Sequence, residues 1–449
     1  MKTPICDFVE KYNNSGILRL HMPGHKGVGA LGVEALDITE ISGADSLYDA
    51  CGIIAESEKN AEVLFDCPTF YSAEGSSHCI RAMLYLAVLA AKQAGKQPMI
   101  AAARNVHKAF LSAAALLDFS VEWLYSDRED SVLSCSLTPE SLERQLGEMG
   151  QIPTAVYLTS PDYLGNVADI AALARVCHRR GCLLLVDNAH GAYLRFLPKS
   201  RHPMDLGADL CCDSAHKTLP VLTGGAYLHI AKAAPELFLE NARDALALFG
   251  STSPSYLILQ SLDSANAVLD GAYQEQLKEF LPLVEACRQN LTEQGYSLVG
   301  EELLKLTISA KPYGYTGDQL AQKLRTQGIE CEFADPDFLV LLLQPSMGAE
   351  GLGRLETALC RIPRLPAMES HIPGAPRGRK ILSVREAALL PRERIPVAQC
   401  VGRILAESSV ACPPAVPIAV CGEQLTEGAQ ACFAYYGITF CTVAKEGEG

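Results

Sequence analysis

Long hydrophobic runs and clusters of basic residues are missing from this chain of 449 residues. The apolar run at 83–91 ends at Lys92, far short of the roughly 20 residues that a transmembrane helix needs. The first residues, MKTPICDFVEKYNN, carry no apolar stretch of the kind found in secretory signals, so we expect a cytoplasmic protein. A net charge of -14 without Lys/Arg clusters argues against nucleic acid or a membrane as partner.

Metal-binding and disulfide patterns are also missing, although the chain has 17 cysteines. No C-x-x-C pair occurs, and we expect no metal site. An odd number of cysteines in a chain without a secretory signal is not typical of a disulfide framework. We therefore expect reduced cysteines that pack as small apolar residues.

Short apolar runs alternate with helical stretches through the middle of the chain. Strands are predicted at 98–103, 121–126, 154–160, 182–187 and 226–230, and helices at 108–117, 138–149, 170–180 and 235–269. This alternation is typical of an α/β protein with a mainly parallel sheet and helices on both faces.

Composition shifts divide the chain into four segments. We expect an N-terminal arm at 1–50, a large domain at 51–270, a small α+β domain at 271–370 and a C-terminal module at 371–449. The arm is irregular and rich in glycine. The small domain has strand candidates in LLKLTISA and DFLVLLLQ, and the module begins with the Pro/Gly/Arg-rich linker HIPGAPRGRK.

The segment DSAHKTL places Lys217 just beyond a predicted strand. A lysine there suits a Schiff base with a carbonyl cofactor, although a surface lysine would look the same. Thirty residues upstream, the strand CLLLV ends in Asp187, where a carboxylate points into the ligand crevice of a parallel sheet. The Asp187 carboxylate would keep the pyridinium nitrogen of pyridoxal phosphate protonated. The alternative is that Asp187 only caps the helix that follows. Because Lys217 and Asp187 both follow predicted strands at a spacing that suits adjacent strands, we favour the cofactor interpretation.

Two further motifs lie where strands give way to helices. Gly75, Ser76 and Ser77 in SAEGSSHC open a helix, and such an N-terminus can bind a phosphate group or serve as an ordinary cap. His107 in ARNVHKAF also opens a helix, where it could stack on the cofactor ring or be purely structural.

An ordered set of motifs resembles the Orn/Lys/Arg decarboxylase family. The motifs are HMPGHKG, DITEISGADSL, EGSS, RNVHK, TSPDYLGN, VDNAHGAY, DSAHKTL and GSTSPSYLILQSLDSAN, followed by 383–407 and CPPAVPIAVCGE. The resemblance covers the whole chain, in the short form without an N-terminal wing domain. It implies a fold-type I, aspartate-aminotransferase-like large domain with a mainly parallel sheet, plus a smaller α+β C-terminal domain.

The resemblance also implies roles for individual residues. Lys217 resembles the lysine of the internal aldimine, Asp187 the partner of the pyridine nitrogen, and His107 the ring-stacking histidine. The positions that resemble the family's phosphate-binding residues are Ser76, Ser77, Ser214 and His216, together with Gly75. His190 stands near the 3′-oxygen of the cofactor. Ser251 and Thr252 would reach the phosphate bound by a neighbouring subunit. A homodimer or higher homo-oligomer with shared active sites is therefore expected.

These roles predict decarboxylation of arginine, lysine or ornithine to the corresponding amine, a step of polyamine biosynthesis. The reaction would run through an external aldimine and a quinonoid, and Lys217 or His216 would return the proton. Glu332 and Glu423 are candidates for binding the distal amine of the substrate. An aminotransferase or another fold-type I lyase remains an alternative. So does a catalytically degenerate homologue that binds pyridoxal phosphate, because Asn188 stands where the family's D-E-A-H-G has a carboxylate.

Overall fold

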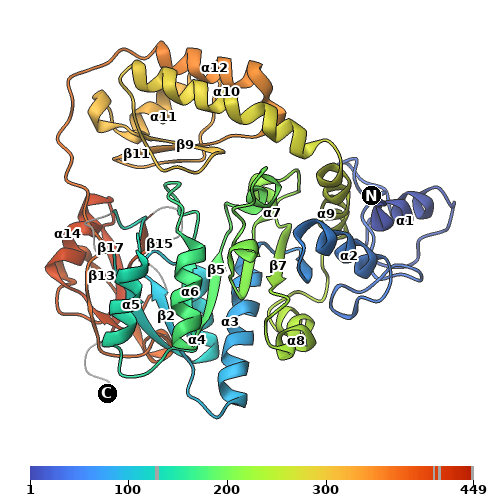
Figure 1. Ribbon diagram of the computed structural model, residues 1–449, viewed down its shortest axis with the longest axis horizontal. Helices are drawn as coiled ribbons and strands as arrows, with labels where there is room; N and C mark the ends of the chain where they lie inside the picture. Colours follow the sequence, from blue (N-terminus) through green and yellow to red (C-terminus); the bar gives the residue numbers. More distant parts are fainter. Residues whose placement is uncertain (127–130, 408–409, 413–415, 446–449) are drawn as a thin grey trace. The chain divides into compact units, whose positions relative to one another are not determined.

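The computed structural model describes residues 1–126, 131–407, 410–412 and 416–445 (Figure 1). Residues 413–415 of the CPPAVPIAVCGE motif lie outside the described residues. The chain folds into two compact units, one made of residues 1–97 and 170–275 and the other of residues 98–169 and 276–449. We call them unit 1 and unit 2. Among the described residues, no helix is both long and apolar enough to cross a bilayer.

Unit 1 is built on four strands in the order β1-β7-β6-β5. Strands β5 and β6 are parallel, and the other neighbours are antiparallel. The strands are β1 (Thr69–Ser72), β5 (Leu183–Asp187), β6 (Leu210–Asp213) and β7 (Ala226–Ile230). The helices are α1 (Pro4–Asn13), α2 (Ile53–Phe65), α3 (Ser76–Gln93), α6 (Ile170–Arg180), α7 (Ala215–Thr218), α8 (Glu236–Ala247) and α9 (Tyr256–Asp270).

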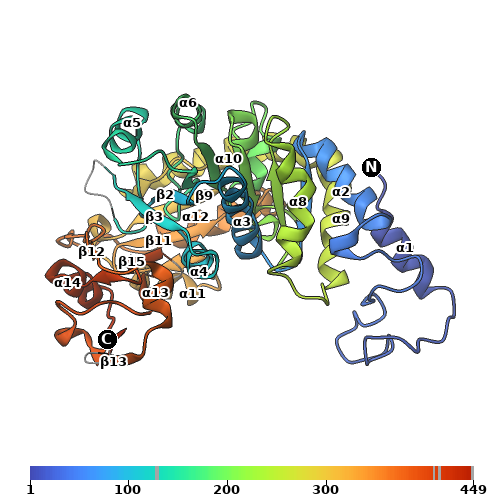
Figure 2. The same ribbon diagram turned by 90° about the horizontal axis from the view of Figure 1, so that it is seen from below.

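Helix α3 is the centre of the apolar core of unit 1. It packs against β5, β6, β7 and α8, and its side chains at Ile80, Met83, Leu84 and Leu86 are fully buried. Helices α1 and α2 pack against α9. The segment between α1 and α2 runs as a mostly irregular trace, but the segment at 1–50, predicted to be an irregular arm, also contains the regular helix α1 (Figure 2).

Unit 2 contains a parallel three-stranded part in the order β4-β2-β3 and an antiparallel sheet in the order β10-β11-β9-β8. The first comprises β2 (Met99–Ala103), β3 (Ser120–Leu124) and β4 (Ala155–Thr159), with α4 (Lys108–Leu117) and α5 (Pro139–Glu148). The second comprises β8 (Ser297–Val299), β9 (Lys305–Ser309), β10 (Phe333–Ala334) and β11 (Phe338–Leu342). Helices α10 (Tyr273–Glu293), α11 (Gly317–Arg325) and α12 (Gly348–Cys360) lie on one face of it (Figure 1).

The C-terminal part of unit 2 contains three short antiparallel strand pairs and two helices. The pairs are β12 (Arg379–Lys380) with β16 (Glu423–Gln424), β13 (Arg392–Pro396) with β17 (Phe440–Ala444), and β14 (Val410–Cys412) with β15 (Val416–Ala419). The helices are α13 (Val384–Leu389) and α14 (Glu427–Tyr435). Its apolar core includes Val397, Leu405, Ile418 and Phe433.

The predicted helix at 235–269 is wrong in one respect, because the structure has two helices there. Helix α8 ends at Ala247 and α9 begins at Tyr256. Pro254 has no backbone N–H to continue a helix, and Gly250 lies so close to Tyr48 that a Cβ would be 1.9 Å from its hydroxyl. The apolar periodicity continues on both sides of this break, which is why the sequence alone suggested one helix.

Candidate active site

Two parallel strands of unit 1 end next to each other and carry most of the predicted site. Asp187 is the last residue of β5 and Asp213 the last of β6, and Asp187 pairs in register with Cys212. The segments that follow, 188–191 and 214–217, therefore leave the same edge of the sheet side by side. This is the edge at which α/β proteins bind ligands.

Lys217 and His190 meet across these two segments. The Nζ atom of Lys217 lies 3.0 Å from Nε2 of His190, and the His190 side chain is buried. Asp187 is 2 % exposed, and its Oδ1 accepts hydrogen bonds from the backbone N–H of Ala189 at 3.2 Å and from the thiol of Cys212 at 3.7 Å. The predicted amine, imidazole and carboxylate thus come from two neighbouring segments at one edge of the sheet of unit 1.

The N-terminus of α3 carries a pair of hydroxyl groups. Ser214 donates a hydrogen bond to Ser76 at 2.7 Å, and Ser77 follows in the first turn. Gly75 precedes the helix with a φ of +74°, a conformation that favours glycine, and its N–H donates to the carbonyl of Gly224 at 2.7 Å. The N-terminus of this 18-residue helix and the two hydroxyls together form a donor set that suits a phosphate group.

His216 is held by the backbone of the neighbouring strand. The ring Nδ1 of His216 lies 3.0 Å from the carbonyl oxygen of Gly225, and the backbone N–H of His216 donates to the same oxygen at 3.2 Å. Because a carbonyl can only accept, the ring carries its proton on Nδ1. The tautomer leaves Nε2 with the lone pair.

Ser251 and Thr252 lie in the exposed loop between α8 and α9. The N–H of Ser251 donates to Oε1 of Glu74 at 2.5 Å, directly before Gly75. The loop therefore approaches the α3 N-terminus within the same chain. Contribution to a neighbouring subunit stays a prediction.

His107 belongs to unit 2, whereas all the other predicted cofactor-binding residues belong to unit 1. It caps the N-terminus of α4, where its Nδ1 accepts the backbone N–H of Ala109 at 3.1 Å. A capping role is thus present in the structure, and stacking on a cofactor ring stays a prediction.

Glu332 and Glu423, the two candidates for the distal amine, both lie in unit 2. Glu332 accepts a hydrogen bond from the Tyr163 hydroxyl at 3.3 Å. Glu423 is buried, lies 3.5 Å from Arg104 and accepts the N–H of Val420 at 2.9 Å. These contacts give Glu423 a structural role inside the unit.

A buried polar cluster around Asp213 was not predicted from the sequence. His202, Cys211 and Asp213 have ligand atoms within 4.8 Å of one another, a spacing that can hold a metal ion. However, Nδ1 of His202 accepts the backbone N–H of Met204 at 3.4 Å, so the ring proton is on Nε2 and faces Asp213. The tautomer therefore favours a hydrogen-bonded cluster over metal binding.

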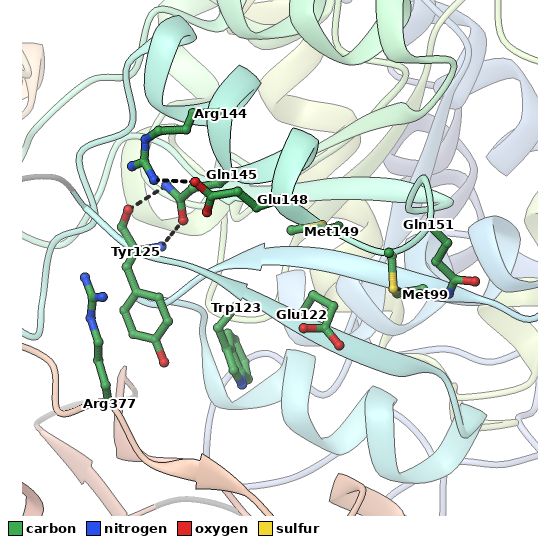
Figure 3. A pocket seen from close by; sticks show the side chains of 11 residues that line it. Met99, Glu122, Trp123, Tyr125, Arg144, Gln145, Glu148, Met149, Gln151 and Arg377 are labelled. Atoms are coloured by element: carbon green, nitrogen blue, oxygen red, sulfur yellow. Dashed lines mark hydrogen bonds and ion pairs between the residues drawn. The ribbon is translucent and has the colours of Figure 1, made fainter.

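A cavity of about 660 Å³ in unit 2 contains none of the predicted residues (Figure 3). Its polar groups largely satisfy one another. Arg144 pairs with Glu148 at 3.2 Å, Gln145 bonds both backbone groups of Tyr125, and Arg377 stacks on the Tyr125 ring at 4.6 Å. The cavity thus gives no competing set of catalytic groups.

Comparisons with known proteins find one family along most of the chain. The model of the Orn/Lys/Arg decarboxylase major domain matches residues 3–351, and that of the Orn/Lys/Arg decarboxylase C-terminal domain matches residues 384–444. The arginine decarboxylase of Bacillus subtilis is 29 % identical over 462 residues, which cover 95 % of this chain and 92 % of the relative. That of Halalkalibacterium halodurans is 28 % identical, with coverages of 95 % and 91 %.

Solved structures show the same fold. A lysine decarboxylase from Francisella novicida superposes with a TM-score of 0.81 at 16 % identity, over 99 % of this chain and 81 % of the other. The constitutive lysine decarboxylase of Escherichia coli gives 0.77 at 17 % identity, over 99 % and 82 %. The predicted fold class, a fold-type I large domain with a smaller C-terminal domain, is confirmed.

Proposed function

Because the chain belongs to the Orn/Lys/Arg decarboxylase family, we propose that it is a pyridoxal-phosphate-dependent decarboxylase of a basic amino acid. The observation that carries this proposal is the meeting of Lys217 and His190 beside Asp187 at one edge of the sheet. Arginine is the first substrate to test, since the relatives from Bacillus subtilis and Halalkalibacterium halodurans are named arginine decarboxylases. Lysine and ornithine complete the class.

The chemistry of the donor set fits pyridoxal phosphate. Lys217 would bind its aldehyde and Asp187 its ring nitrogen, while Gly75, Ser76, Ser77 and Ser214 would bind its phosphate. When bound, the cofactor supplies an electron sink for the electrons that remain after the carboxylate leaves. His107 would pack on the ring.

The residues of the chain select the bond that breaks and handle the protons. Asp187 is held by Ala189 N–H and by the Cys212 thiol, which keeps its carboxylate directed at one position. The amine of Lys217 can exchange a proton with His190 over 3.0 Å. Lys217 in its protonated form, or His216 after its Nε2 has taken up a proton, would then give a proton to the α-carbon of the product. The released amine would feed polyamine biosynthesis.

A homodimer or higher homo-oligomer in the cytoplasm completes the proposal. The arm exposes large apolar side chains, with Leu18, Leu20 and Leu31 each about 80 % exposed. Such a stretch is costly to leave in water, and a second copy of the chain would cover it. Ser251 and Thr252 would then serve the phosphate site of the partner.

The test is a substrate panel with the purified protein and added pyridoxal phosphate. We expect release of CO₂ and amine from at least one of arginine, lysine and ornithine. Lys217→Ala should remove the visible absorbance of the bound cofactor and lower kcat by about 10³-fold or more, because the amine that binds the aldehyde is lost. Lys199→Ala, which changes an exposed lysine of unit 1, is the matched control and should leave both unchanged.

No product from any of the three amino acids would overturn the proposed function. Conversion that instead requires a 2-oxo acid would favour the aminotransferase alternative. Cofactor binding without turnover of any kind would favour the degenerate homologue.

A further inference from the structure

Asn188 and Asp213 link the two strand ends that carry the proposed catalytic residues. Asn188 directly follows Asp187, and Asp213 directly precedes Ser214. The Nδ2 of Asn188 donates a hydrogen bond to Oδ1 of Asp213 at 2.7 Å, and both side chains are completely buried. A polar pair at this depth is strong, because no water competes for either partner.

On the β5 side, Asn188 belongs to a compact turn. Its N–H donates to the carbonyl of Cys212 at 2.9 Å, and its carbonyl accepts the N–H of Gly191 at 2.8 Å. A Cβ at position 191 would be 2.0 Å from Oδ1 of Asn188, so only glycine fits there. The hydrogen bond of the amide to Asp213 fixes its position, and the turn from Asp187 to Gly191, including His190, is held with it.

On the β6 side, Asp213 is anchored independently of Asn188. Its Oδ2 accepts hydrogen bonds from Nε2 of His202 at 3.0 Å and from Nε2 of His229 at 3.1 Å, both from fully buried rings. Its Oδ1 also accepts from the thiol of Cys211 at 3.8 Å. His229 in turn contacts the Thr69 hydroxyl of β1 at 2.9 Å. The carboxylate is thus a stationary acceptor for Asn188.

We propose that Asn188 and Asp213 form a positioning pair, whose amide–carboxylate hydrogen bond holds the turn of Asp187 and His190 in register with Lys217. The inference rests on the proposed function. It also explains the amide at position 188. A carboxylate there would face Asp213 at hydrogen-bond distance, and two buried like charges repel each other strongly. The departure from D-E-A-H-G is therefore compensated by Asp213 and does not indicate a degenerate enzyme.

An exchange of the two groups tests the pair. Asn188→Asp places two carboxylates opposite each other, and Asp213→Asn places two amides there. In the double exchange, Oδ1 of the new amide at position 213 still accepts from both imidazoles, while its Nδ2 donates to the new carboxylate at position 188. Every hydrogen bond keeps its partners except that of Cys211. Asp244→Asn, an exposed change on α8, is the control.

We expect each single variant to raise the Kd of pyridoxal phosphate and to lower kcat by about 10- to 100-fold, with a shifted visible spectrum and a nearly unchanged KM. The double variant should recover the spectrum, the Kd and kcat to within about threefold of the unaltered protein. Single variants that lose thermal stability but keep spectrum, Kd and kcat would overturn the proposal, since the pair would then be merely structural.

The double variant decides the question if the single variants do not fold. Recovery of folding together with the original spectrum supports the pair, and failure to recover overturns it. An unaltered protein that binds pyridoxal phosphate but releases no CO₂ overturns only the proposed function, and the spectra and Kd values still test the pair. An unaltered protein that binds no pyridoxal phosphate overturns both.

Discussion

Each unit buries a carboxylate almost completely, yet the two behave in opposite ways. In unit 1, burial alone would raise the pKa of Asp213, but His202 and His229 lower it well below its usual range. In unit 2, burial raises the pKa of Glu423, and Arg104 and the Val420 N–H only partly offset this effect. Of these two carboxylates, the one beside a guanidinium is thus the one whose charged form is less favoured.

The two sites differ in which groups donate hydrogen bonds to the carboxylate oxygens. Asp213 accepts from two imidazoles and from the amide of Asn188, all within 3.1 Å. Arg104 instead donates to the carbonyls of Pro417 and Ile418 at 2.9 Å and remains 3.5 Å from Glu423. The two imidazoles therefore more than offset the cost of burying Asp213, whereas a single guanidinium at 3.5 Å does not offset the cost of burying Glu423.

The largest expected effect on stability comes from Arg104→Met. It leaves two buried carbonyls without their donor and Glu423 without its cation, which should lower the free energy of unfolding by about 3–5 kcal/mol. Arg385→Met is the matched control, because Arg385 also donates to two carbonyls but is exposed, and its loss should cost below about 1 kcal/mol. Urea denaturation measures both, and equal losses would contradict this account of Arg104.

Glu58 of unit 1 is another buried carboxylate, and its pKa makes the stability of the protein depend on pH. Burial raises its pKa from 4.5 to about 7, although Arg243 donates to it at 2.6 Å and the N–H of Tyr71 at 2.9 Å. Between these pH values the folded state holds a proton that the unfolded state has lost. The contribution of Glu58 to the free energy of unfolding therefore has its full value below pH 4.5 and is lost as the pH rises to about 7.

Glu58→Gln should remove this pH dependence, which amounts to as much as about 3 kcal/mol. The measurement is the free energy of unfolding from urea titrations at pH values between 5 and 8. Glu56→Gln changes an exposed neighbour on α2 and should leave the pH dependence intact. If the free energy of unfolding changes with pH equally in both variants, Glu58 is already ionised in the folded state.

The smallest effect is expected for Glu423→Gln. Burial already disfavours the charged form of Glu423, and a glutamine oxygen can still accept the Val420 N–H. The change should cost below about 1 kcal/mol near neutral pH, judged by the urea midpoint. A loss as large as that of Arg104→Met would mean that the ion pair itself, and not the two carbonyls, holds Arg104 in place.

Much of the fold could be predicted from apolar periodicity. Strands expected at 98–103, 182–187 and 226–230 are present as β2, β5 and β7, and the helices expected at 108–117 and 170–180 are α4 and α6. Strand β1 was missed, because its four residues lie in a turn-rich segment too short to show a period. The break between α8 and α9 was missed because helical periodicity is present on both sides of it.

The candidate site was predictable where a residue type and a strand end coincide. Asp187 and Lys217 were found in this way, and the motif DSAHKTL even contains Asp213. Its pairing with Asn188 was not predictable, since the two are 25 residues apart and meet only through the register of β5 with β6. His202 reaches the same carboxylate from a loop with no periodic signal.

By itself, the sequence determined the alternation of strands and helices, the strand-end positions of Asp187 and Lys217, and the resemblance to a decarboxylase family. These are local properties of neighbouring residues, and periodicity and motifs record them. Only the tertiary structure decided that two imidazoles lower the pKa of Asp213, while burial raises that of Glu423 at a distance of 3.5 Å from its cation. The charge of a buried group depends on which donors the fold brings within hydrogen-bond distance, and that is a property of the packed chain.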